Sequence, residues 1–200
     1  MSILVDNCNH WIGFHIANDL LENSYTVDGI GDENRDLLMF LGRNSSFNFV
    51  GRNLEKQYET AIMIGGQSDT EFKSGQTLII NPKSTDRVEN RVEINTPLLF
   101  GEWMPMNEEG FYNNNTFIRF DSDYFQTEAI YIDDFTKGLM QWLKMKEFPS
   151  TLEVRSEKNK DNKHVKLENT VYIRDNRPMA DKVKNVLEHY QLYRKIYESL

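Results

Sequence analysis

The stretch ILVDNCNHWIG, residues 3–13, decides the fold, because an apolar run passes through a short polar turn into an amphipathic segment. Residues 2–5 are apolar enough to predict a buried strand. Between residues 11 and 21, apolar side chains recur at helical spacing, which predicts a helix. A strand that enters a helix through such a turn is typical of the first unit of a parallel sheet with helices on its faces.

The same alternation of short apolar runs and longer amphipathic segments continues along the chain. Strands are predicted at residues 24–31, 47–51, 60–66, 77–81, 91–100 and 129–132. Helices are predicted at residues 36–42, from 133 or 134 to 145, and at 181–200. We therefore expect an α/β fold, with one Rossmann-like domain over residues 1–200 and a mostly parallel sheet. Residues 155–169 interleave both charges and predict a solvated loop before a closing strand and helix at 170–200.

Two connections are short for this pattern, because only residues 67–76 and 82–90 separate the fourth, fifth and sixth strands. A crossover between parallel neighbours normally takes about a dozen or more residues, usually as a helix. Either these strands are not parallel neighbours, or the crossover helices after strands 4 and 5 are missing or shortened. One sheet face would then expose apolar side chains, namely Ile62, Ile64, Leu78 and Ile80. Because water is a costly neighbour for apolar area, we expect a homo-oligomer or a protein partner to cover this face.

The composition restricts the partners and the compartment. The 200 residues carry a formal net charge of -8, which argues against nucleic acid or an anionic membrane surface as a partner. The single cysteine, Cys8, cannot form an internal disulfide. The start of the chain has no basic, apolar leader pattern, and no apolar run approaches the length of a membrane span. We therefore expect a cytoplasmic protein.

Four stretches in order carry a family resemblance: ILVDNCNHWIGFHIANDLLENSYTV, TAIMIGG, NTPLLFGEW and TEAIYIDDFTKGLMQWL. Together they resemble the extended short-chain dehydrogenase/reductases, the NAD-dependent nucleotide-sugar epimerases and dehydratases, over residues 1–154. The resemblance implies a Rossmann fold and a dinucleotide bound at the first turn. It also implies a catalytic tyrosine with a lysine four residues later.

The positions that would bind the cofactor are degenerate. Asn7, His10 and Gly13 align with the three glycines of the family's turn, so only the glycine that packs the helix survives. Asn7 can adopt the left-handed conformation, but the imidazole of His10 would occupy space that a pyrophosphate needs. The ribose-binding carboxylate aligns with Gly31, and Asp32 follows by one residue. We expect no bound NAD or NADP, although a single phosphate could still bind at the helix start.

The catalytic pair is absent from the sequence. None of the nine tyrosines has lysine at the fourth following position, and the nearest pattern is Tyr190 with Arg194 on the closing helix. The segment expected to hold this pair, residues 81–91, is too short for its helix. We therefore predict no catalytic residues.

Patterns for metal binding, thiol chemistry and paired acid/base carboxylates are also weak. The four histidines, at positions 10, 15, 164 and 189, have no metal-ligand spacing. Cys8 could have a lowered pKa at a helix start, but an ordinary buried cysteine is the favoured interpretation. Asp133 and Asp134 are better explained as helix caps than as paired acid/base carboxylates.

Two hypotheses follow. The favoured one is a noncatalytic, epimerase-like binding or scaffold module. The alternative is a nucleotide-sugar or NAD(P)-binding enzyme of the epimerase/reductase type with an atypical active site. The aromatic residues Trp103, Phe111 and Tyr112 could line a ligand cleft under the alternative, but we favour a role in the core.

Overall fold

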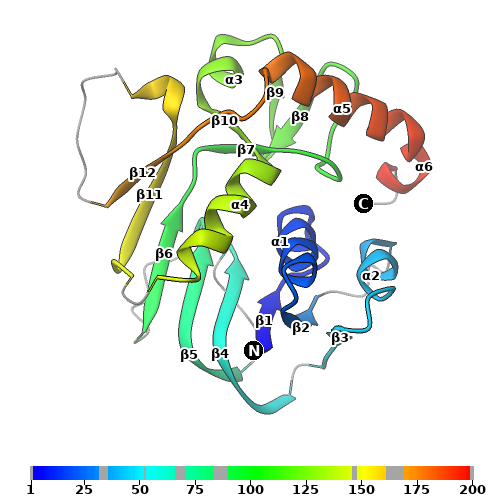
Figure 1. Cartoon of the computed structure of the whole chain (residues 1–200). Coiled ribbons are helices and arrows are strands. Elements are labelled where there is room, and N and C mark those ends of the chain that lie inside the picture. The colour runs from blue at the N-terminus through cyan, green and yellow to red at the C-terminus, as the bar shows by residue number, and fades with distance from the viewer. Residues whose placement is uncertain are drawn as a thin grey trace. The chain divides into compact units, whose positions relative to one another are not determined.

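The computed structural model describes residues 2–31, 36–51, 53–65, 71–82, 90–145, 148–160 and 169–198 (Figure 1). Internal contacts divide the chain into two compact units, which are described separately. Unit 1 comprises Met1–Asn95 and Leu139–Leu152, and unit 2 comprises Thr96–Gly138 and Glu153–Leu200.

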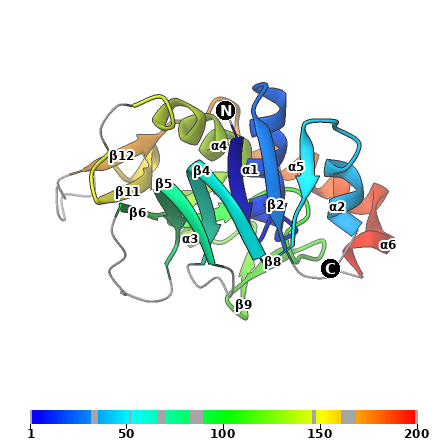
Figure 2. The same ribbon diagram turned by 90° about the horizontal axis from the view of Figure 1, so that it is seen from below.

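Unit 1 is built on a parallel sheet with the strand order β6-β5-β4-β1-β2-β3 (Figure 2). Its strands are β1 (Ser2–Asp6), β2 (Thr26–Ile30), β3 (Phe47–Phe49), β4 (Asn53–Ile64), β5 (Glu71–Ile80) and β6 (Arg91–Asn95). Its helices are α1 (Trp11–Glu22) and α2 (Asp36–Leu41). This arrangement confirms the predicted α/β class and the mostly parallel sheet.

The first helix forms as its apolar spacing predicts. The buried side of α1 carries the periodic residues Ile12, Ile16 and Leu20, while both of its ends are capped. His10 caps the start of α1, and the backbone N–H of Asn23 donates to two carbonyls in the last turn.

The connections after β4 and β5 differ in part from the expectation. Both strands begin earlier than predicted, and they are parallel neighbours with Ile62 beside Leu78. Residues 71–76, expected in a loop, belong to β5. Between β4 and β6 the described residues contain no helix, in agreement with the prediction that the crossover helices after strands 4 and 5 are missing or shortened.

Three of the four apolar residues expected on a bare sheet face are buried. Ile62, Leu78 and Ile80 each have an exposed fraction of 0% in the single chain, and Ile64 is half-buried. These four side chains therefore do not form the bare apolar face that was expected. Self-association stays a prediction, without this reason for it.

Unit 2 is a set of strand pairs and helices. The parallel pairs join β7 (Leu98–Phe100) with β10 (Ala129–Tyr131), and β11 (Thr151–Ser156) with β12 (Thr170–Ile173). The antiparallel hairpin joins β8 (Gly110–Asn113) and β9 (Thr116–Arg119). The remaining elements are α3 (Asp123–Glu128), α4 (Ile132–Trp142), the 3-10 turn η1 (Glu157–Asn159), α5 (Met179–Leu192) and α6 (Arg194–Tyr197). α4 and β11 each run across the boundary between the units.

Several sequence predictions need correction in this unit. The strand predicted over 91–100 is two strands, β6 and β7, and the β8–β9 hairpin and α3 were not predicted. The predicted charged loop begins later than residue 155, because β11 runs to Ser156 and η1 follows it. The rest of that loop, residues 161–168, lies outside the described residues.

An aromatic core fills unit 2. The rings of Phe100, Phe111 and Phe125 are fully or almost fully buried and pack edge to face on one another. Trp103 is also buried, and its ring stacks on Tyr197 with the centroids 5.3 Å apart. Of the aromatic residues assigned to the core, Trp103 and Phe111 are confirmed, whereas Tyr112 is exposed.

Candidate functional site

The turn between β1 and α1 is the candidate site, since the first parallel strand ends there. Asn7 adopts the left-handed conformation with φ 57°, as expected for the residue in place of the first glycine. Its side-chain amide donates to the carbonyl of Ile64 at 3.1 Å, which ties the turn to the end of β4. Residue 7 therefore stabilises the turn with its own side chain.

Gly13 is required by the close approach of the helix to this turn. A Cβ atom at Gly13 would lie 2.1 Å from the carbonyl oxygen of Asn7. Real Cβ atoms do not approach backbone so closely, so no larger residue fits without moving α1. The packing role that the resemblance implies for this position agrees with the geometry.

The imidazole of His10 lies at the start of α1. Its Nδ1 accepts a hydrogen bond from the backbone N–H of Ile12 at 3.3 Å. This N–H is among the donors that a helix start offers to an anion. The His10 side chain therefore occupies one backbone N–H group that could otherwise bind an anion.

Asn9 and Cys8 lie against the glycines of β2. A Cβ atom at Gly31 would meet the side-chain oxygen of Asn9 at 2.2 Å. One at Gly29 would meet the Cys8 sulfur at 2.7 Å and the ring of Phe47 at 2.8 Å. The end of β2, where the resemblance places a ribose-binding carboxylate, is thus packed with side chains of the turn itself. Asp32, the predicted carboxylate, lies outside the described residues.

The Cys8 thiol is unreactive in this environment. Burial and the nearby charge of Asp6 raise the pKa of Cys8 to about 12. A thiol in this state stays protonated at neutral pH, which disfavours nucleophilic chemistry. Cys8 is buried, as the favoured interpretation expected.

One tyrosine lies beside a lysine in unit 1, but both side chains donate hydrogen bonds to Asp28. Tyr58 donates to Oδ2 of Asp28 at 2.9 Å, and Lys56 donates to the same oxygen at 2.7 Å. The Lys56 ammonium lies 5.2 Å from the centre of the Tyr58 ring. Burial and the Asp28 carboxylate raise the pKa of Tyr58, the opposite of what a catalytic phenol needs.

A second tyrosine and lysine meet in unit 2 in a similar way. Tyr131 donates to Oε1 of Glu102 at 2.6 Å, and burial together with Glu102 raises the pKa of Tyr131. Lys182 lies over the Tyr131 ring, with its ammonium 5.8 Å from the ring centre. Neither pair resembles a phenol that is poised to give up its proton at neutral pH.

Lys182 forms a buried ion-pair network that the sequence patterns did not reveal. It has an exposed fraction of 0% and donates to Oδ2 of Asp134 at 2.7 Å and to Asp175. Asp134 lies in the first turn of α4, not at its cap, and also accepts from Asn176 at 2.8 Å. Asp134 therefore forms an ion pair with Lys182 from inside the helix. The prediction that Asp134 caps the start of this helix is wrong.

A shallow pocket of about 490 Å³ with charged residues in its lining opens beside this network in unit 2. Its lining includes Lys158, Asp175 and Arg177. The Arg177 guanidinium lies 6.0 Å from the centre of the Tyr131 ring and has no carboxylate partner among the described residues. The cavity therefore offers one uncompensated cation to a ligand.

Across the described ranges, no group of three or more His, Cys, Asp or Glu residues could hold a metal ion. In the same part of the chain, no helix combines the length and the apolar composition that crossing a bilayer requires.

Comparisons with known proteins identify the fold. No family model and no curated protein sequence matches the chain. Its structure is similar to dTDP-glucose 4,6-dehydratase from Bacillus anthracis in complex with NAD, with a TM-score of 0.59, 8% identity and coverage of 98% of both chains. It is also similar to UDP-glucose 4-epimerase from Thermotoga maritima with UDP-glucose, with a TM-score of 0.56, 10% identity and coverage of 96% of this chain and 99% of that one.

A third similar structure is yeast methylglyoxal/isovaleraldehyde reductase complexed with NADPH, with a TM-score of 0.51, 12% identity and coverage of 100% of both chains. The chain therefore has the fold of the extended short-chain dehydrogenase/reductases, as the sequence resemblance implied.

Proposed function

We propose that this protein is a noncatalytic binding or scaffold module built on the epimerase/dehydratase fold. The observation that supports this most directly is the packing of Asn9 against Gly31, together with the capping of α1 by His10. Both side chains take space and donors at the turn where a dinucleotide would bind in this fold.

A dinucleotide needs two things from this turn. Its pyrophosphate needs the backbone N–H groups at the helix start, and its ribose needs a carboxylate at the end of the second strand. Here His10 uses the N–H of Ile12, and the amide of Asn9 lies against the backbone at Gly31. Binding would have to displace both contacts, so we expect neither NAD nor NADP to bind.

The environment of the tyrosines supports the same proposal. A catalytic tyrosine needs a pKa brought down toward neutrality by a neighbouring cation. Tyr58 and Tyr131 have lysines near their rings, yet their hydroxyls donate to carboxylates and their pKa values are raised. Proton transfer by either phenol would be slow at neutral pH.

Calorimetry and thermal denaturation with NAD and NADP test this proposal. We expect no heat of binding and no rise in melting temperature. A ligand that did bind would be detected, because at 100 times its Kd it would add about 2.7 kcal/mol to the unfolding free energy. The double variant Asn7→Gly, His10→Gly restores the three-glycine pattern and serves as a matched comparison. Micromolar binding of either dinucleotide by the unmodified chain would overturn the proposal.

The cavity of unit 2 supports the alternative, a protein that binds a nucleotide sugar without the usual active site. Arg177 and Lys158 can donate to a phosphate or another small anion, and Arg177 has no carboxylate partner among the described residues. UDP-glucose and inorganic phosphate are the probes. Under this alternative, Arg177→Ala abolishes the heat of binding, whereas Arg174→Ala leaves it unchanged because Arg174 does not line the cavity.

A scaffold acts through another protein or a second copy of itself. Light scattering measures the solution mass against the 23.6 kDa of one chain. A mass near a multiple of this value supports self-association, and a monomer leaves a different protein as the partner.

A further inference from the structure

The antiparallel hairpin of unit 2 carries a concave surface of its own, which shares no residue with the pocket at Arg177. A hollow of about 530 Å³ is lined by the hairpin and the start of α3, including Asn113, Asn114, Thr116, Phe117 and Tyr124. All of its lining residues fall within positions 113–124. The hollow therefore belongs to one local structure.

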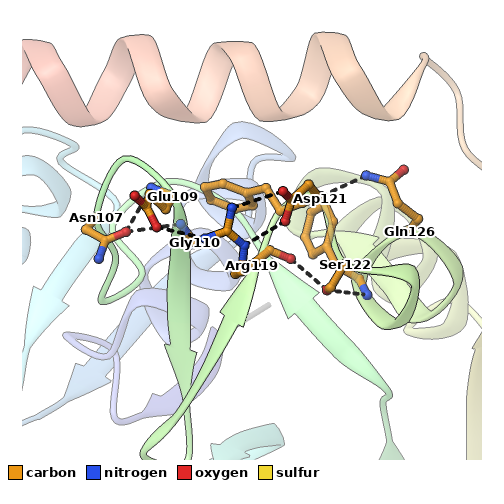
Figure 3. Close-up of polar contacts among 9 residues, drawn as sticks. Asn107, Glu109, Gly110, Arg119, Asp121, Ser122 and Gln126 are labelled. Carbon is orange, nitrogen blue, oxygen red and sulfur yellow. Dashed lines mark hydrogen bonds and ion pairs between the residues drawn. The ribbon is translucent and has the colours of Figure 1, made fainter.

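The cation of this surface is already paired with carboxylates. Arg119, its only charged lining residue among those described, donates to both carboxylate oxygens of Asp121 at 2.9 and 3.0 Å. A third bond from Arg119 reaches Glu109 at 2.9 Å (Figure 3). A guanidinium with two carboxylate partners has little to offer an anion, so the surface does not favour an anionic ligand.

A network of hydrogen bonds holds the frame of the hollow. Ser122 donates to the carbonyl of Arg119 at 2.7 Å, and Gln126 donates to the carbonyl of Phe120 at 2.8 Å (Figure 3). At the tip, Asn114 and Asn115 adopt φ 47° and 64°, as the tight two-residue turn of a twisted hairpin requires. A site fixed in this way loses little conformational freedom when a ligand binds.

Aromatic rings and unpartnered polar groups share the hollow. Tyr124 is 55% exposed, and Phe117 packs against the exposed ring of Tyr112 with the centroids 5.1 Å apart. The side chains of Asn113, Asn114 and Thr116 have no hydrogen-bond partner among the residues that the structure describes. Exposed rings beside free amide and hydroxyl groups provide apolar contact and hydrogen bonding at the same place.

We propose that this hollow binds a neutral carbohydrate. The apolar C–H face of a sugar ring fits against Tyr124 or Phe117, while its hydroxyls exchange hydrogen bonds with Asn113, Asn114 and Thr116. An anionic ligand would find no unpaired cation in the lining. The inference is independent of whether the turn after β1 binds a dinucleotide.

Saturation-transfer NMR and calorimetry test this site with glucose, galactose, N-acetylglucosamine and their disaccharides. We expect binding of at least one neutral sugar, weakened at least about threefold by Tyr124→Ala. Tyr172→Ala is the matched control, because Tyr172 is an exposed tyrosine on β12 of the same unit and lies outside the hollow. Glucuronic acid and glucosamine should bind no better than the neutral sugars.

Four results would overturn the inference. These are no transfer to any neutral sugar, equal binding by the Tyr124→Ala variant, an equal loss in the control, and a preference for the charged sugars. Circular dichroism establishes that each variant is folded, which is expected because Tyr124 is largely exposed.

Discussion

Single residues determine the structure of the turn after β1. Where the fold places glycine, Asn7 keeps the left-handed backbone, and His10 caps the helix. Asn9 then closes the space beside Gly31. Asn7 and His10 each stabilise the turn through a side-chain hydrogen bond.

Gly13→Ala should strongly destabilise the protein. Its new Cβ atom would lie 2.1 Å from the carbonyl oxygen of Asn7, and backbone cannot move aside cheaply. We expect the unfolding free energy to fall by about 2–4 kcal/mol, measured by urea denaturation. Gly51→Ala is the control, since a Cβ atom there meets nothing within 4 Å. Equal effects of the two substitutions would contradict the packing argument.

Gly31→Ala tests the contact with Asn9 by a double-mutant cycle. Alone, the added methyl group clashes with the Asn9 side chain, so stability should fall. With Asn9→Ala present, that space is open and the same substitution should cost less. We expect a coupling energy of about 0.5–3 kcal/mol from denaturant titrations. Additive effects would show that Asn9 does not occupy the space.

At the scale of elements, the sequence patterns predicted those helices and strands whose formation depends on residues close together in the chain. The β1–α1 unit was predicted because strand, turn and helix lie together in residues 2–22. The starts of β4 and β5 were missed because charged and polar residues predominate there, as at residues 55–57 and at 71, 73 and 74, a composition typical of loops. Strand pairing, a nonlocal interaction, overrides that local preference.

The polar contacts of the candidate sites were harder to predict for the same reason. Lys182 lies 48 positions from Asp134 in sequence, and no local spacing links them. Tyr58 and Asp28 are likewise 30 positions apart. The degenerate turn could be read directly, since Asn7, His10 and Gly13 are close in sequence, but the role of Asn9 needed its contact with Gly31.

Lys182→Met should destabilise unit 2 by separating α5 from α4. The substitution leaves Asp134 buried without its cation, a situation that costs about 3–5 kcal/mol. Lys184→Met is the matched control on the same helix, because the Lys184 side chain is 72% exposed. Thermal denaturation followed by circular dichroism should show a large drop for the first variant only. Similar melting temperatures for both variants would contradict a structural role of the pair.

For the whole molecule, each unit contains a carboxylate that folding keeps ionised. Burial alone would raise the pKa of Asp28, but hydrogen bonds from Lys56, Asn48 and Tyr58 outweigh it and lower the pKa. Asp175 follows the same pattern, because its bonds to Lys158 and Lys182 outweigh burial and lower its pKa. Both units should therefore respond to acid in the same direction.

The sign of that response follows from proton linkage. A carboxylate with a lowered pKa in the folded state contributes stability that is complete above its unfolded pKa of 3.8. The contribution is lost as the pH falls from that value through the lower folded pKa, because the unfolded chain then binds more protons. We expect the unfolding free energy from urea titrations to decline below about pH 4.5. Asp28→Asn and Asp175→Asn should each be less stable at pH 7 and show a shallower decline, while an unchanged acid slope in both variants would exclude these carboxylates as the cause.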